Sequence, residues 1–85
     1  MIITGKMILE GRGWTIGKIN DQPYAFKKIG ETELTIEFCY GDICVGAFDK
    51  DLNPIGEKKR CEDLATAIIE AEILENKEIA KLKSN

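Results

Sequence analysis

The chain has 85 residues, of which 44% are hydrophobic and 32% charged, with a net charge of -3 and no histidine. These values are ordinary for one globular domain with a modest core. The acidic balance argues against direct nucleic-acid binding, which normally needs a basic surface. No apolar run reaches the roughly 20 residues of a membrane span, and no signal-peptide pattern is present. We therefore expect a single domain over residues 1–85, located in the cytoplasm, without membrane contact.

Everything before residue 61 is typical of short strands joined by turns. Alternating apolar and polar side chains predict the strands, and Gly, Asn, Asp and Pro between them predict the turns. Because short turns join neighbouring strands antiparallel, we expect a meander. The expected strands cover residues 1–10, 14–19, 24–29, 33–40, 43–49 and 54–60.

The hairpin around Gly41-Asp42 has the clearest pattern. Strand 33–40 alternates strictly, and a Gly-first turn of two residues suits a type II′ hairpin. Counting from this turn, every inward residue meets an apolar partner, and a slip by one residue would destroy the match. The inward side chains are Leu34, Ile36, Phe38 and Tyr40. The expected pairs are Tyr40 with Ile43, Phe38 with Val45, and Ile36 with Ala47.

The third strand is expected to join this hairpin through a three-residue loop at 30–32. That loop sets Phe26 opposite Ile36 and Tyr24 opposite Phe38, so both rings face the core. The remaining positions turn outward and give the sheet a half-apolar outer face, which is unusual next to water. The expected outer-face residues are Ala25, Ile29, Cys39, Cys44, Gly46 and Phe48.

Residues 61–82 form the one segment with helical periodicity. Their apolar residues share one stripe, acidic residues come early and lysines late, as the helix dipole favours, and only Glu75 interrupts the stripe. The stripe consists of Leu64, Ile68, Ala71, Ile79 and Leu82. The expected fold is therefore α+β: an antiparallel meander of five or six short strands with one C-terminal helix packed across one face. A half-exposed apolar flank would instead favour a partner-binding helix.

The residue types exclude several chemistries. Without histidine there is no imidazole base and no histidine-ligated metal. Residues 49–53 begin like a calcium loop, but Pro54 and Arg60 stand where glycine and glutamate are required. Cys39 and Cys44, directly opposed in the expected register, are too few to bind zinc. We expect no cofactor, no metal and no enzymatic activity.

The preferred hypothesis is a small protein-interaction module. It would act through the outer sheet face or an edge strand and bind a protein partner or a second copy of itself as a homodimer. The candidate surface consists of Phe48, Cys39, Cys44, Gly46, Ala25 and Ile29.

Two other hypotheses come from different classes. One is an acidic inhibitor, a phage or mobile-element accessory protein that occupies the basic site of a nucleic-acid enzyme. It requires one acidic patch formed by Glu62, Asp63, Glu70, Glu72 and Glu75. The other is a thiol or redox protein centred on Cys61, because a helix N-terminus with Lys59 and Arg60 nearby would lower the pKa of this thiol.

Overall fold

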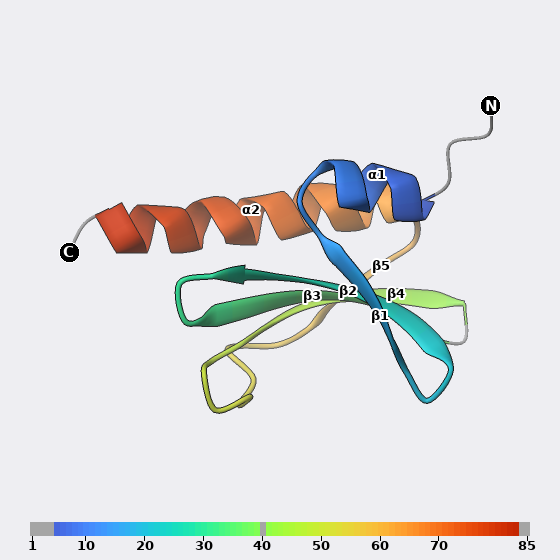
Figure 1. Cartoon of the computed structure of the whole chain (residues 1–85), viewed down its shortest axis with the longest axis horizontal. Coiled ribbons are helices and arrows are strands. Elements are labelled where there is room, and N and C mark those ends of the chain that lie inside the picture. The colour runs from blue at the N-terminus through green and yellow to red at the C-terminus, as the bar shows by residue number, and fades with distance from the viewer. Residues whose placement is uncertain (1–4, 40, 84–85) are drawn as a thin grey trace.

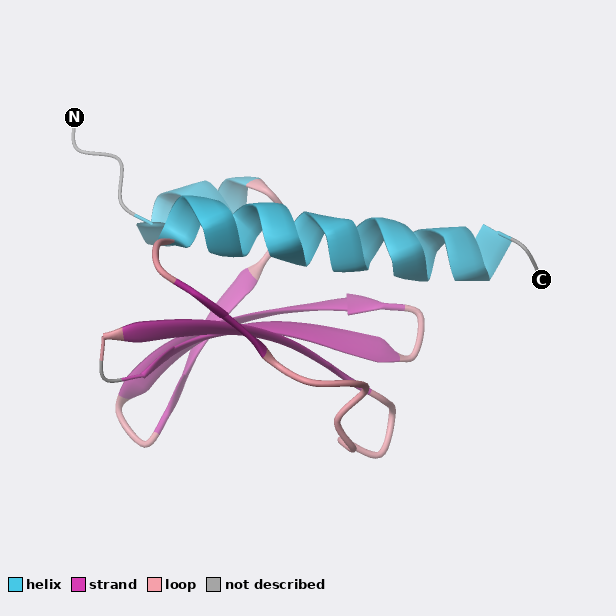
Figure 2. Cartoon of the chain, turned by 180° about the vertical axis from the view of Figure 1, so that it is seen from behind, coloured by secondary structure: helices cyan, strands magenta, loops and turns pink. Residues whose placement is uncertain are grey.

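The computed structural model of the chain describes residues 5–39 and 41–83. The strands form one antiparallel sheet in the order β1-β2-β3-β4-β5. Both helices lie on one side of this sheet, and no helix among the described residues covers the other side (Figures 1 and 2). The predicted α+β fold, a meander with a C-terminal helix across one face, is confirmed. The elements are α1 (Gly5–Gly11), β1 (Thr15–Ile19), β2 (Gln22–Ile29), β3 (Thr32–Cys39), β4 (Asp42–Phe48), β5 (Lys59–Cys61) and α2 (Leu64–Lys83).

The core lies between α2 and the sheet face that it covers. Leu34 and Ile36 of β3 are fully buried there, and Val45 of β4 lies beside them. Several of the other core residues are small, which lets the helix backbone approach the sheet closely. These small residues are Ala25, Ala47, Ala67 and Ala71. We call the covered side the inner face and the opposite side the outer face.

The predicted first strand is wrong, because residues 5–11 form the helix α1; residues 1–4 of that prediction lie outside the described residues. The Gly-Arg-Gly segment ends this helix instead of closing a hairpin. Gly13 takes a positive φ of 91°, its N–H donates to Glu10 O, and the Trp14 N–H donates to Leu9 O. This is the Schellman pattern, in which the residues flanking the helix end also pack together. Leu9 and Trp14 are both buried in the core.

The register of the β3–β4 hairpin is two residues from the predicted one. Phe38 pairs with Ile43, and Ile36 pairs with Val45. The predicted partner of Ile43, Tyr40, lies outside the described residues. A shift of two residues leaves each side chain on its predicted face, so the hydrophobic pattern could not distinguish the two registers. Phe38 stays on the inner face, but it is only partly buried at the edge of the core.

The register between β2 and β3 differs from the prediction by one residue, which exchanges the two faces of β2. Ile29 pairs with Thr32 across a two-residue loop, in which Gly30 has a φ of 62°. Ala25 therefore lies opposite Ile36 on the inner face. The rings expected in the core, Tyr24 and Phe26, lie on the outer face.

Two other boundaries moved for local reasons. Asn20 and Asp21 both have positive φ, as a two-residue type I′ turn requires, so β2 begins at Gln22 instead of after Pro23. The expected sixth strand is reduced to β5, and before it Pro54 makes a single bridge to Phe48.

The helix α2 begins three residues later than predicted. Asp63 caps it by accepting a hydrogen bond from the Thr66 N–H at 2.7 Å, and this bond holds the pKa of Asp63 below its usual value, with a further contribution from the Thr66 side chain. Cys61 consequently ends β5 and does not cap the helix.

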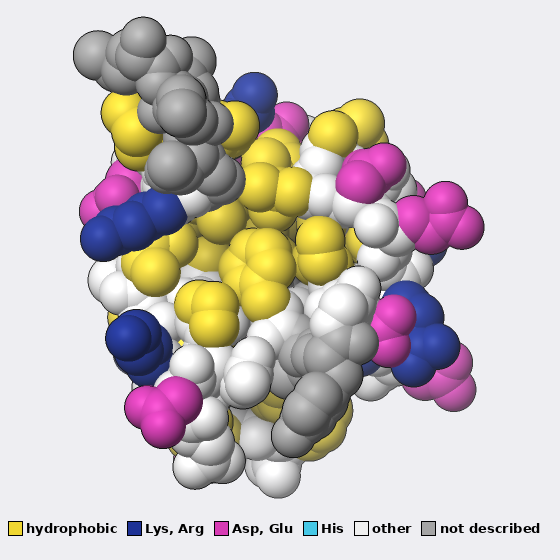
Figure 3. All heavy atoms as spheres, turned by 90° about the vertical axis from the view of Figure 1, so that its right-hand side faces the viewer, with side chains coloured by type: hydrophobic (Ala, Val, Ile, Leu, Met, Phe, Trp, Pro, Cys, Tyr) yellow, Lys and Arg dark blue, Asp and Glu magenta, His cyan; other side chains and the backbone are white. Residues whose placement is uncertain are grey.

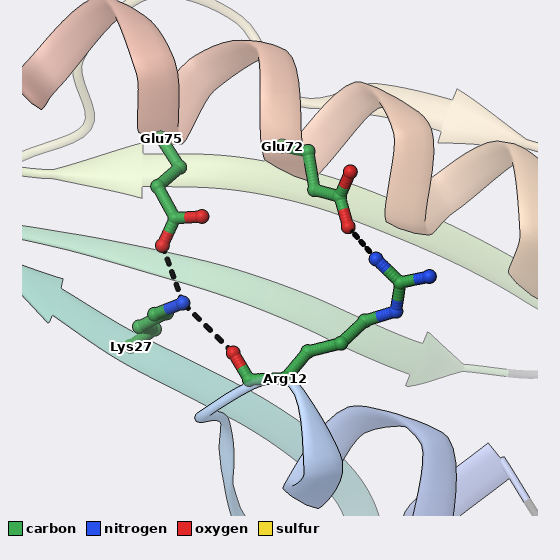
Figure 4. Close-up of polar contacts among 4 residues, drawn as sticks. All are labelled: Arg12, Lys27, Glu72 and Glu75. Carbon is green, nitrogen blue, oxygen red and sulfur yellow. Dashed lines mark hydrogen bonds and ion pairs between the residues drawn. The ribbon is translucent and has the colours of Figure 1, made fainter.

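Glu75, which interrupts the apolar stripe of α2, has a partner on the sheet. Lys27 lies on the inner face of β2, and its ammonium forms an ion pair with Glu75. The same ammonium donates to Arg12 O at 2.9 Å, and Arg12 pairs with Glu72 (Figure 4). Glu75 thus fastens α2 to β2 and to the segment after α1.

Candidate functional site

The outer face is organised around three alternating residues of β3: Glu33, Thr35 and Glu37. The pairing places aromatic rings on both sides of this row, with Tyr24 opposite Glu37 and Phe48 opposite Glu33. Thr35 lies between Phe26 of β2 and Gly46 of β4. All three rings are only partly buried.

A hollow of about 270 Å³ opens on this face. Two of its lining side chains, Ile19 and Leu52, are 53% and 67% exposed, so apolar side chains stand at its rim. Residues with carboxylates and residues with hydroxyls, the latter being Thr35 and Tyr24, also line it. The described residues that line it are Ile19, Tyr24, Glu33, Thr35, Glu37, Phe48 and Leu52.

The aromatic wall on the β2 side depends on a glycine of β1. Tyr24 stacks on Phe26 with ring centroids 5.3 Å apart. A Cβ atom at Gly17 would lie only 2.9 Å from the Tyr24 ring, so the ring rests directly on the β1 backbone. A side chain at position 17 would force the ring to move.

Lys58 lies across the β4 side of the outer face. Its stem would lie 3.1 Å from a Cβ atom at Gly46, so a side chain at position 46 would require the stem to shift by a few tenths of an ångström. Its ammonium donates to both carboxylate oxygens of Glu37 at 3.0 Å and lies 5.5 Å from the centre of the Phe48 ring. The outer face therefore already holds one ammonium group between a carboxylate and an aromatic ring.

Two polar groups of the hollow have no partner among the described residues. Thr35 is 5% exposed, and its Oγ1 is buried without a hydrogen bond. The Glu33 carboxylate makes no ion pair or hydrogen bond within residues 5–39 and 41–83. Buried polar groups in native proteins are nearly always hydrogen-bonded, and each exception calls for an explanation.

The loop after β4 holds Leu52 at the rim of the hollow. Asp49 Oδ1 accepts hydrogen bonds from the N–H groups of Asp51 and Asn53, both at 2.9 Å. Leu52 has a φ of 64°, which is uncommon for a residue with a side chain. The loop lies on the side away from the helices (Figure 1, lower left). These bonds hold the backbone of Leu52 in an unfavourable conformation. The hydrophobic side chain of this residue is exposed to water.

The structure divides the six residues of the predicted surface. Phe48, Gly46 and Cys44 lie on the outer face, although Phe48 pairs with Glu33 and Cys44 with Glu37. Ala25 is fully buried in the core and Ile29 packs against it, so their predicted outward placement is wrong. The Cys39 side chain lies outside the described residues, and its backbone pairs with Asp42 instead of Cys44.

Sequence reasoning missed the aromatic wall of the hollow on the β2 side, Tyr24, because of the slip in β2. A two-residue loop at Gly30-Glu31 would have turned Tyr24 and Phe26 outward, and Gly30 was a usable signal for it. Lys58 and Leu52 had no comparable signal, since their places depend on how the loop between β4 and β5 folds over the sheet.

The two other hypotheses depend on the Cys61 thiol and on an acidic patch, and the surroundings of both differ from those expected. Cys61 is 5% exposed, and burial raises the pKa of its thiol; Glu70 adds to this, and Lys59 opposes it. The predicted lowering of the Cys61 pKa is wrong.

The carboxylates of the proposed acidic patch are largely engaged in ion pairs. These pairs are Glu70 with Lys59, Glu72 with Arg12, and Glu75 with Lys27.

Two apolar hollows lie on the helix side of the molecule. A groove of about 390 Å³ runs between α1 and α2, lined mainly by apolar side chains such as Ile8 and Ile69. A second hollow of about 210 Å³ opens where α1 and the start of α2 meet the sheet, beside Phe38. Hydrophobic side chains gather at the end of the molecule where α1 and the start of α2 lie (Figure 3). Neither hollow contains a buried side-chain polar atom that lacks a partner among the described residues.

Comparison of the chain with known protein families, with curated proteins and with solved structures gives no match. No helix within residues 5–39 and 41–83 is both long and apolar enough to cross a membrane. We therefore infer function from the geometry of the outer face.

Proposed function

We propose that the chain is a small, non-enzymatic protein-interaction module that binds a partner through its outer sheet face. The observation that carries this proposal is the hollow between Tyr24 and Phe48, with exposed Ile19 and Leu52 at its rim. The binding energy of interfaces concentrates on a few residues, often aromatic, that become fully desolvated in the complex. The hydrogen-bonded loop that displays Leu52 lowers the entropy lost on binding, because this side chain is already in place.

The size of the hollow favours a protein side chain over a small molecule. Sites for small ligands usually enclose roughly 300–1,000 Å³, whereas this hollow measures about 270 Å³ and is open to water. It lies within a wider sheet face whose aromatic side chains can contact a partner. We expect this partner in the cytoplasm, where the free thiols of Cys44 and Cys61 would stay reduced.

The proposal predicts that Phe48→Asp abolishes partner binding while the fold is retained. A charge at Phe48 would have to be desolvated at the centre of the interface, so affinity should fall by 2 kcal/mol or more, about thirtyfold. The partner would be isolated by affinity capture from the native cell, purified and titrated calorimetrically against the wild type and the variant.

Ile69→Asp is the matched control for this experiment. Ile69 is also apolar and 59% exposed, but it lies on α2 on the other side of the sheet. Equal affinities of the Phe48 and Ile69 variants would contradict the proposal. Sedimentation at several concentrations decides whether the partner is a second copy, since a chain that stays monomeric at high concentration is not a homodimer.

A further inference from the structure

We propose that the outer-face hollow is a receptor site for a basic side chain of the partner protein, with Glu33 as its counter-ion. This inference deepens the proposed function, since it names the chemistry of the group that enters the hollow. The Glu33 carboxylate, which has no partner among the described residues, and the buried Thr35 hydroxyl are the two observations that point to a ligand.

The first argument is charge. Glu33 is a partly buried carboxylate beside an aromatic ring, Phe48. A partly buried carboxylate gains more from a cation than a fully solvated one, because the surrounding dielectric is lower. Aromatic faces also attract cations within about 6 Å. Lys28 lies opposite Glu33 on the outer face, but no ion pair joins the two side chains in the part of the chain that the structure describes, so a basic partner competes with Lys28 for this carboxylate.

The second argument is that the chain binds an ammonium group of its own next to the hollow. Lys58 places its ammonium on Glu37 and 5.5 Å from the Phe48 ring. The same two chemical elements, a carboxylate and the Phe48 ring, adjoin the open part of the hollow on the Glu33 side. Lys58 thus demonstrates the kind of group that this surface holds.

The third argument is the Thr35 hydroxyl. Thr35 lies on β3 between Glu33 and Glu37, and its Oγ1 has no hydrogen-bond partner among the described residues. This oxygen lies 3.6 Å from a Cβ position at Gly46, beside the Lys58 stem. This oxygen has almost no exposed surface, so an entering ammonium or guanidinium group can donate to it, as well as to Glu33, only after the side chains that cover it move aside. Binding would therefore satisfy a group that folding leaves unsatisfied.

The inference assigns Lys58 a restraining role. Its ammonium neutralises Glu37 and repels a second cation in the neighbouring space. Removing the charge while keeping the stem over Gly46 should free Glu37 and strengthen binding of a basic side chain. Lys58→Met makes this change with an unbranched side chain.

The test uses two short peptides, acetyl-Gly-Lys-Gly-amide and its norleucine analogue, which lacks only the charge-bearing amine. Titration into the ¹⁵N-labelled chain should shift the amide resonances of Glu33, Thr35 and Gly46 with the lysine peptide, and at least about threefold less with the norleucine peptide, as for an exposed ion pair of up to roughly 1 kcal/mol. Glu33→Gln should weaken lysine-peptide binding by about threefold, and Lys58→Met should strengthen it by a similar factor. Glu10→Gln changes the net charge equally on the helix side and should leave binding unchanged.

Equal binding of the two peptides, or no saturable shift at these amides, would overturn the inference. So would a Glu33→Gln variant that binds like the wild type, or a Lys58→Met variant that binds more weakly than the wild type. The proposed function fails on a different result, namely partner binding that survives Phe48→Ala, which removes the ring without adding a second carboxylate beside Glu33. The two failures can therefore be told apart.

Discussion

Thr35 occupies an unusual position among the individual side chains, because its hydroxyl is buried and has no hydrogen-bond partner in the described part of the chain. Leaving a buried hydroxyl unsatisfied costs roughly 1–3 kcal/mol. Thr35→Val replaces it by a methyl group of nearly the same shape, so the variant should be about 1 kcal/mol more stable in urea denaturation. It should also bind the lysine peptide more weakly, as expected where a residue serves binding at the expense of stability.

Thr15→Val is the control for this prediction. Thr15 lies on the same face but is exposed, and its substitution should change stability by less than about 0.5 kcal/mol. A Thr35→Val variant that is less stable than the wild type would mean that the hydroxyl has a partner in solution.

Cys61 should make stability depend on pH in the alkaline range. Burial raises the pKa of its thiol, so the folded chain holds this proton more tightly than the unfolded chain, where a thiol titrates near about 8.5. The contribution is complete below that pH and is lost as pH rises through the pKa of the folded state. One such group changes the free energy of unfolding by at most about 1.4 kcal/mol per pH unit.

Urea denaturation at pH 7 to 10 measures this loss. Cys61→Ala should be less stable at neutral pH but should show a flatter decline above pH 8.5, while Cys44→Ala retains Cys61 and should keep the decline. Parallel pH profiles for the wild type and the Cys61 variant would refute the assignment.

The helix α2 presents two apolar flanks, and packing decides which one is buried. Ala67, Ile68 and Ala71 face the sheet, whereas Ile69 and Ile73 are 59% and 45% exposed. The far end of the helix is held by a hydrogen bond from Thr32 Oγ1 to Glu78 at 3.1 Å. These contacts fix the rotation of the helix about its axis.

Adjacent isoleucines test this orientation. Ile68→Ala should cost about 2–5 kcal/mol of stability, because Ile68 is only 8% exposed and its truncation leaves a cavity. Ile69→Ala should change stability by less than about 0.5 kcal/mol. Similar losses in chemical denaturation for the two variants would show that the helix is rotated or that both flanks are covered in solution.

In the molecule as a whole, the contacts that stabilise the fold lie on the helix side of the sheet, whereas the proposed binding surface lies on the outer side. Polar contacts on the helix side tie the layers together, with Lys27, Arg12 and Lys59 each paired to a glutamate of α2. The outer side carries aromatic rings that pack on one another and on strand backbone. Substitutions there should therefore affect binding more than folding, as Phe48→Asp and Glu33→Gln are designed to show.

The sequence by itself determined the class of fold and most strand positions. Strict alternation over residues 33–39 identified the inner face of β3, and Leu34 and Ile36 are fully buried as this pattern predicts. Helical periodicity located α2 to within three residues at each end. These features are local, since each follows from the spacing of side chains along one segment.

Only the tertiary structure decided the registers and the identity of α1. The sequence does not distinguish a loop of two residues from a loop of three. At residues 30–32 this difference of one residue places Tyr24 and Phe26 on the outer face instead of in the core. Residues 5–11 were expected in a strand but form a helix, because the Schellman end at Gly13 and the burial of Leu9 and Trp14 favour it. Glu75 interrupts the apolar stripe in the sequence, but in the structure it forms an ion pair with Lys27 of the sheet. The hollow on the outer face depends on all of these long-range choices, so no single segment of the sequence could specify it.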